Sequence, residues 1–231
     1  MKRPFGHRYP PAGLPTPFSA QAGRAVTRWA IRGYLGAEHI DRHHIPKTGP
    51  AILVSNHPTF ADPFLVAFGT QRWVSWLAFD EALEWPGAGH VMRLYHAIPL
   101  NTQKPEPSAI KTAYSTLAHG RILGVFCEGR RSSGFDLNEA VKSGAACLAL
   151  RAGAPVVPVT ISGARKAWPV GGYPKPRKVV VRYHAPIAPE SFDPSLDRRE
   201  RAKLMTVEIA RSISKALPPA GAPRFLPPRR G

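Results

Sequence analysis

Cysteine is scarce in this sequence, which holds only Cys127 and Cys147 among its 231 residues. Two cysteines are too few for the disulfide framework of a small secreted domain, and they do not make a thiolate zinc site. The sequence therefore predicts two buried thiols in a reducing compartment.

Long apolar runs are also missing. No stretch approaches the roughly 18 uninterrupted apolar residues of a membrane-spanning helix, so no such helix is expected. The chain begins Met1-Lys2-Arg3, but no apolar segment of the kind found in secretory signals follows. A cleaved secretory signal is therefore not expected either.

Acidic residues are few: 15 Asp and Glu stand against 32 Lys and Arg, which gives a formal net charge of +17 at pH 7. Such a balance implies a polyanionic partner. Composition leaves the choice open between nucleic acid, an anionic membrane surface and a phosphorylated ligand. The hydrophobic content of 43% excludes a wholly disordered chain and suits one domain with appended segments.

The two ends of the chain differ from its middle. Residues 1–44 are predicted to hold a Pro-rich arm and then, from about residue 19 to 35, a basic amphipathic helix. Two sides of this helix differ in chemistry: Arg24, Arg28 and Arg32 follow one, and Val26, Trp29, Ala30 and Tyr34 follow the other. The pattern favours a helix on a membrane surface, with a helix packed on the domain as the alternative. Residues 218–231 are predicted to be a Pro- and Arg-rich tail.

Between these ends, residues 45–217 alternate short apolar runs with helical patterns. The alternation predicts an α/β fold with a mostly parallel or mixed central sheet flanked by helices, and with the amphipathic helical segment at its N-terminal side. The expected strands cover residues 51–54, 73–79, 97–100, 122–127, 156–161 and 179–183. The expected helices cover residues 62–68, 80–95, 108–117, 139–151 and 197–217.

The first predicted strand is followed by His57 and, five residues later, by Asp62. Ligands bind at the carboxyl ends of strands in open α/β sheets, so His57 lies where chemistry is expected. A tight turn would let Asp62 accept a hydrogen bond from one ring nitrogen and raise the basicity of the other. The pair is then suited to remove a proton from a hydroxyl nucleophile. The alternative is an N-cap histidine followed by a first-turn aspartate.

Two further segments follow predicted strands. Glu128, Gly129, Arg130, Arg131 and Ser132 come directly after the strand at residues 122–127. Small residues, hydroxyls and arginines at such a point suit a phosphate or another oxyanion, although a surface turn with solvated arginines would look the same. The strand at residues 156–161 is interrupted by Pro158, and a purely structural strand remains the alternative there.

Together these segments resemble the glycerolipid acyltransferase family, typified by the bacterial 1-acylglycerol-3-phosphate acyltransferases. Asn56-His57-Pro58-Thr59-Phe60-Ala61-Asp62 is similar to the family's His-four-residues-Asp motif, and Phe126-Cys127-Glu128-Gly129-Arg130-Arg131-Ser132 to its Phe-Pro-Glu-Gly-Thr-Arg-Ser motif. Val157-Pro158-Val159 and Lys142-Ser143-Gly144-Ala145 resemble two shorter family segments. The likeness spans about residues 45–190.

The resemblance implies an enzyme that transfers a fatty acyl group from an acyl thioester to the hydroxyl of a lysolipid, most typically 1-acylglycerol-3-phosphate. His57 would be the general base and Asp62 its orienting partner. Glu128, Gly129, Arg130, Arg131 and Ser132 would bind the acceptor and its phosphate, and Pro158 would shape the acyl site. The implied partners are acyl-CoA or acyl carrier protein as donor, the lysolipid, and an anionic membrane surface at the cytoplasmic face of the inner membrane. No metal, no further cofactor and no covalent acyl-enzyme is implied.

Some positions depart from the family pattern. Arg130 and Cys127 stand where the family usually has Thr and Pro, and Thr102 stands where a second phosphate-binding arginine is expected. Another lysolipid, such as a lyso-aminolipid, is therefore an alternative acceptor. Arg130 or Lys104 would have to replace the missing cation if the acceptor carries a phosphate.

Other interpretations explain less of the sequence. A basic nucleic-acid-binding protein would account for the charge but not for the paired motifs, and no nucleic-acid motif is present. The segment from Glu38 to His44 has metal-ligand residue types, but no second cluster completes a site, so a solvated linker is expected. Cys127 is not expected to be a nucleophile. Residues 140–189 hold eight Lys and Arg and no acidic residue, which predicts either a solvated face or contact with anionic lipid.

Overall fold

The structure is a computed structural model that describes residues 18–79, 83–84, 88–101, 107–129, 141–169 and 172–217. Several predicted features lie outside these ranges. They are the Pro-rich arm, the tail at residues 218–231, and the residues Thr102, Lys104, Arg130, Arg131 and Ser132.

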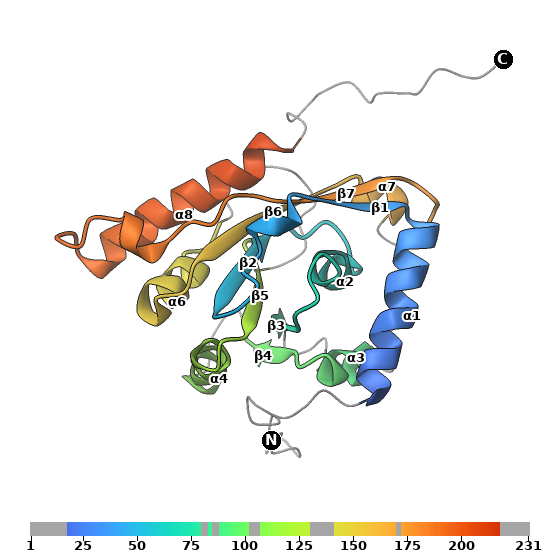
Figure 1. Ribbon diagram of the computed structural model, residues 1–231, viewed down its shortest axis with the longest axis horizontal. Helices are drawn as coiled ribbons and strands as arrows, with labels where there is room; N and C mark the ends of the chain where they lie inside the picture. Colours follow the sequence, from blue (N-terminus) through green and yellow to red (C-terminus); the bar gives the residue numbers. More distant parts are fainter. Residues whose placement is uncertain are drawn as a thin grey trace.

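A seven-stranded sheet with the strand order β1-β7-β6-β2-β5-β3-β4 forms the centre of the fold (Figure 1). All neighbouring strands are parallel except β6 and β7, which are antiparallel. The strands are β1 (Ala37–Ile40), β2 (Ala51–Ser55), β3 (Val74–Phe79), β4 (Ile98–Leu100), β5 (Ile122–Phe126), β6 (Val156–Ser162) and β7 (Val179–Tyr183). The predicted α/β fold with a mixed sheet is therefore confirmed.

Helices cover both faces of the sheet. The helices are α1 (Phe18–Tyr34), α2 (Asp62–Ala67), α3 (Ala88–Leu94), α4 (Pro107–Ala118), α6 (Gly144–Ala152), α7 (Ala164–Ala167) and α8 (Arg198–Lys215), with 3-10 turns at Arg42–His44 and Pro189–Ser191. One apolar core joins the sheet to α1, α2 and α7, and a second joins its other face to α4, α6 and α8. Figure 1 shows α1 and α8 far apart on the two sides of the sheet.

The apolar sequence of the central strand β2 accounts for its place in the middle of the sheet. All five of its residues are buried, and it lies between the parallel strands β5 and β6. A parallel strand covered on both faces reads as a continuous apolar run rather than an alternating one, as Ala51-Ile52-Leu53-Val54 does. The carboxyl ends of β6, β2 and β5 therefore meet at one edge of the sheet, where the segments after them come together.

Helix α1 presents its apolar side to solvent and one of its arginines to the domain. The exposed fractions of Phe18, Val26 and Trp29 are 85%, 68% and 80%. Arg24 instead points inward, where its guanidinium donates hydrogen bonds to the carbonyls of Thr70 (2.6 Å) and Arg72 (3.1 Å). Arg24 therefore lies against the domain, although in the sequence it belongs to the same side of the helix as Arg28 and Arg32.

Two other expectations are corrected by the fold. The segment from Glu38 to His44 is not a solvated linker, because β1 pairs with β7 and the Nδ1 of His44 contacts the Tyr183 carbonyl at 2.8 Å. Cys147 is exposed, so the prediction of a buried thiol holds for Cys127 alone. Within the described ranges, no helix is both long and apolar enough to cross a bilayer.

Candidate active site

The site begins where β2 ends. His57 follows Ser55 by two residues, and its Nδ1 lies 2.8 Å from Oδ2 of Asp62, the first residue of α2. The Asp62 side chain is completely buried, whereas the His57 side chain keeps 16% of its surface exposed. The predicted pair therefore has hydrogen-bond geometry, with an accessible imidazole in front of a buried carboxylate.

Thr59 completes the environment of this carboxylate. Its backbone N–H donates to Asp62 Oδ2 (2.6 Å) and its hydroxyl donates to Oδ1 (2.5 Å). With both Asp62 oxygens accepting hydrogen bonds, the proton of His57 lies on Nδ1, which faces the carboxylate, and Nε2 is left as the nitrogen that can accept a proton. The N-cap alternative for His57 is wrong, because Ala61 occupies the cap of α2.

The segment after β5 lies against the same histidine. The backbone N–H of His57 donates to Oε1 of Glu128 at 3.3 Å, and Glu128 is buried. Gly129 has a φ of +66°, a conformation that favours glycine, and closes a turn on the Phe126 carbonyl. The structure thus brings together His57, Asp62, Glu128 and Gly129, while Arg130, Arg131 and Ser132 lie outside the described residues.

Lys142 adds a cation that the sequence interpretation did not single out. Its backbone N–H donates to the Cys127 carbonyl at 2.9 Å. A Cβ atom placed on Gly129 would lie 3.0 Å from the Lys142 Nζ, so the missing side chain of Gly129 leaves room for this ammonium group. The Lys-Ser-Gly-Ala segment marks Lys142 in the sequence. Because Lys142 is far from Glu128 along the chain, its position beside the Glu128–Gly129 turn could not be predicted.

Two aromatic rings are stacked behind the imidazole. The His57 and Phe126 rings have centroids 3.7 Å apart with planes 9° from parallel, and Phe126 stacks on Trp76 at 4.6 Å and 14°. Gly124 permits this arrangement, because a Cβ there would lie 2.5 Å from the Trp76 ring. The Asp62 hydrogen bond holds the edge of the imidazole at Nδ1, and the stacked Phe126 ring holds its face.

The third predicted segment, in β6, helps to hold the sheet together at the end of β2 and does not supply a reacting group. Asn56 forms two hydrogen bonds with the backbone of Ile161, through Nδ2 (2.9 Å) and Oδ1 (2.8 Å), and so ties the end of β2 to β6. Pro158 pairs with Val54 further back along the strands. Its neighbours Val157 and Val159 belong to the core on the α2 side, so strand alternation turns Pro158 to the opposite face. The structure does not bring Pro158 to His57, and its predicted role in shaping the acyl site stays a prediction.

Cys127 is placed for packing. It is buried in the core between the sheet and α6. Burial, and then the charge of Glu128, raise the pKa of its thiol, which disfavours the thiolate that a nucleophile needs. Among the described residues, no group of three or more His, Cys, Asp or Glu side chains is arranged to hold a metal ion.

Comparison with known proteins places this geometry in a family. The model of the family described as Acyltransferase matches residues 37–162, more than half of the chain and all of the segments assembled above. The chain belongs to the acyltransferase family. The His57–Asp62 pair and the Glu128–Gly129 turn both lie within the matched region.

Individual relatives of this acyltransferase carry related names. It is 27% identical over 147 residues to the 1-acyl-sn-glycerol-3-phosphate acyltransferase of Bacillus subtilis, a match of 63% of this chain and 70% of that protein. Proteins of the same name from Streptococcus pneumoniae (33% over 138 residues) and Limnanthes alba (29% over 156 residues) are matched over 58% and 66% of this chain. The matches span about half of each of those two proteins.

A solved structure shares the fold. The crystal structure of the 1-acyl-sn-glycerophosphate (LPA) acyltransferase of Thermotoga maritima superposes with a TM-score of 0.58, covering 83% of this chain and 81% of that one at 24% identity. At this identity the likeness concerns the arrangement of strands and helices.

We predict that the ring stack supports turnover. Phe126→Leu removes the aromatic surface against His57 and should lower kcat three- to tenfold, about the 0.5–1.5 kcal/mol of an aromatic pair, with the acceptor KM changed less than twofold. Phe126→Tyr should restore kcat. Phe68→Leu, in the same core but with its ring against Phe64 rather than His57, should lower the melting temperature and leave kcat unchanged. Equal kcat losses in both leucine variants would contradict the prediction.

Proposed function

We propose that this protein transfers a fatty acyl group from an acyl thioester to the hydroxyl of 1-acylglycerol-3-phosphate, giving phosphatidate in phospholipid biosynthesis. The observation that carries the proposal is the hydrogen-bonded His57–Asp62 pair, with its 2.8 Å contact and its partly exposed imidazole. The names of the matched relatives support the same substrate. Acyl-CoA and acyl carrier protein are both proposed as sources of the thioester.

The proposed transfer is one general-base reaction. Nε2 of His57 takes the proton from the acceptor hydroxyl as its oxygen attacks the thioester carbonyl carbon. Asp62 stabilises the imidazolium that forms, since its carboxylate faces Nδ1. When the tetrahedral intermediate collapses, the carbon–sulfur bond breaks and the imidazolium returns the proton to the sulfur. The steps require neither a metal ion nor an acyl-enzyme.

Transfer of a labelled acyl group tests this proposal directly. Purified protein is incubated with radiolabelled acyl thioester and each of several acceptors: 1-acylglycerol-3-phosphate, a lyso-aminolipid, a zwitterionic lysophospholipid and monoacylglycerol. We expect labelled phosphatidate as the main product. Transfer mainly to the lyso-aminolipid would support the alternative acceptor, and absence of transfer to every acceptor would refute the enzyme assignment proposed for this chain.

A phosphate on the acceptor needs cations, and Lys142 is proposed as one of them beside Arg130 and Arg131. Lys142→Met should raise the KM for 1-acylglycerol-3-phosphate about tenfold, the worth of one charge-assisted hydrogen bond, but change the KM for monoacylglycerol less than twofold. Arg131→Ala should show the same selectivity. The control Lys111→Met removes an exposed cation from α4. Equal effects on both acceptors would contradict a phosphate role.

We also propose that the protein works as a peripheral protein on the cytoplasmic face of the inner membrane, with α1 on the anionic lipid surface. The exposed apolar side chains of Phe18, Val26 and Trp29 support this, since an interfacial helix buries such a face among the lipids. Arg32 is exposed on the same helix, where it can contact anionic headgroups.

Liposome flotation tests this placement. Replacing Phe18, Val26 and Trp29 together with serine should lower binding to anionic vesicles tenfold or more, because their apolar surface no longer leaves water. The control replaces Leu204 and Val207, two apolar residues of α8 with exposed fractions of 49% and 50%, and should bind as the wild type does. If only the control lost flotation, the lipid contact would lie on α8 and the proposed role of α1 would be contradicted.

A further inference from the structure

A groove of about 1060 Å³ runs between α6 and α8, outside the site described above. Its residues come from the start of α6 and from α8 along the whole length between Arg198 and Lys215. Eighteen residues of helix span about 27 Å. The groove is therefore long enough for a helical segment of another molecule.

The lining of this groove is basic. Arg198, Arg199, Lys203, Arg211 and Lys215 line it, and none of the described residues that line it is acidic. Helix α8 as a whole carries six basic and two acidic residues, a net charge of +4. One of the cations is partly neutralised, because Arg211 pairs with Glu208 at 3.2 Å. The surface is suited to an acidic partner.

Apolar side chains lie among these cations. Val141, Ala202, Val207 and Ala210 line the groove, and half of the surface of Val207 is exposed. A row of apolar residues bordered by charges is the surface that an amphipathic helix recognises, through apolar contacts at its centre and charge pairs at its edges.

One end of the groove adjoins the candidate active site. Val141 and Ser143 line it and flank Lys142, whose backbone N–H is bonded to the Cys127 carbonyl. Glu128, the residue after Cys127, accepts a hydrogen bond from the backbone N–H of His57. A molecule held in the groove thus reaches the segment that borders His57.

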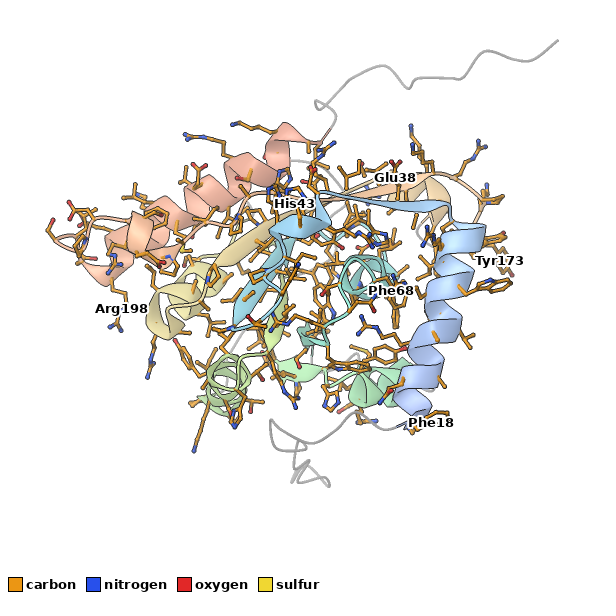
Figure 2. All side chains as sticks on the ribbon, in the orientation of Figure 1. Phe18, Glu38, His43, Phe68, Tyr173 and Arg198 are labelled. Carbon is orange, nitrogen blue, oxygen red and sulfur yellow. The ribbon has the colours of Figure 1, made fainter. Side chains whose placement is uncertain are left out.

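The groove also lies on the sheet face opposite to α1. Helices α6 and α8 pack on one core and α1 on the other. Figure 2 shows Phe18 on α1 and Arg198 on α8 at opposite sides of the molecule. A membrane in contact with α1 would leave the groove facing the aqueous phase, so a soluble partner fits the groove better than a lipid surface does.

We propose that the α6–α8 groove docks the acyl donor as an acidic, helical carrier protein that bears the acyl group as a thioester. The proposal rests on the acyl transfer proposed above and adds the place where the donor binds. A carrier lying along α8 would deliver its thioester at the Val141–Ser143 end, next to the segment that contacts His57. The five cations along a length of about 27 Å suit an acidic helix better than the compact phosphates of a nucleotide-based donor.

Donor-specific kinetics test the proposal. The variant Arg199→Glu/Lys203→Glu reverses two exposed charges of the groove, and the control Lys47→Glu/Lys111→Glu reverses two exposed lysines outside it. Each is assayed with palmitoyl-CoA and with bacterial acyl carrier protein charged with palmitate. For the groove variant we expect the KM of the carrier-linked donor to rise about tenfold or more, with kcat and the KM of palmitoyl-CoA within twofold of wild type.

The outcomes separate the two proposals. Equal KM increases for both donors would assign the groove to the nucleotide part of CoA and overturn carrier docking. Unchanged kinetics with both donors, equal effects in the control, or failure of the wild type to use the carrier-linked donor would also overturn it. If the wild type transfers palmitate from neither donor, the proposed function itself fails.

Cys147 provides an independent reporter, because it is exposed and lines the groove while Cys127 is buried. Maleimide should label Cys147 alone in the folded protein. A saturating amount of the acidic carrier should slow this labelling at least fivefold, and 0.5 M NaCl should abolish the protection by screening the charges. Labelling at the same rate with and without carrier would refute docking in the groove.

Discussion

Replacing His57 with alanine should lower kcat for acyl transfer about 10²-fold or more, with the KM of the acceptor changed little. The substitution removes the nitrogen that would take the hydroxyl proton, and a positioned general base contributes rate enhancements of about 10²–10⁴. The ring is partly exposed and does not fill a closed core, so the variant should fold. The measurement is steady-state transfer of a labelled acyl group, with the melting temperature recorded for each protein.

His119→Ala is the matched control, since His119 is an exposed histidine at the end of α4. It should retain wild-type kcat. Unchanged turnover in His57→Ala would refute the general-base mechanism, and equal losses in both variants would contradict a specific role of His57.

The second large effect is expected for Asp62→Asn, which should lower kcat about 10²-fold with a small change in stability. The arrangement around Asp62 lets the asparagine keep its hydrogen bonds. Its amide oxygen can accept from the Thr59 N–H and from His57 Nδ1, and its amide nitrogen can donate to the Thr59 hydroxyl, which accepts as well as donates. The variant thus removes the negative charge that stabilises the imidazolium and little else.

Asp62→Ala is the informative comparison for this variant. It leaves the buried Thr59 N–H without a partner and opens a space in a completely buried position, so it should lower the melting temperature by several degrees as well as kcat. Asp193→Asn, at an exposed loop, should change neither. A wild-type kcat in Asp62→Asn would show that the carboxylate positions the ring without acting through its charge.

The central part of the fold was predictable because the buried strands of a parallel sheet have a simple signature. The runs at β2, β5 and β6 are continuous and apolar. Their predicted ends lie within one or two residues of the observed ones. β1 escaped prediction because Glu38 and His39 interrupt its apolar character. It is an edge strand that pairs with β7, and a Lys178–Glu38 ion pair joins it to the residue before β7.

The candidate site was predictable to the extent that its groups are close in sequence. His57 and Asp62 are five residues apart, so a single turn brings them together. The Phe126–Trp76 stack and the Lys142–Gly129 contact join segments that meet only through the sheet order β2-β5-β3 and the return of the chain into α6. The direction of Arg24 was equally hidden, because free carbonyls at the end of α2 leave no mark on the residues of α1.

Gly124 shows how a position without any functional group can limit the choice of amino acids as severely as a reacting residue does. Even the single methyl group of alanine would meet the rigid indole of Trp76 at 2.5 Å, and neither β5 nor the ring can move without shifting Phe126. In a scan of all single substitutions scored by enzyme activity, Gly124 should therefore fall in the same intolerant class as His57. Only a stability measurement on each variant would separate the residue that reacts from the one whose missing side chain leaves room for the stack.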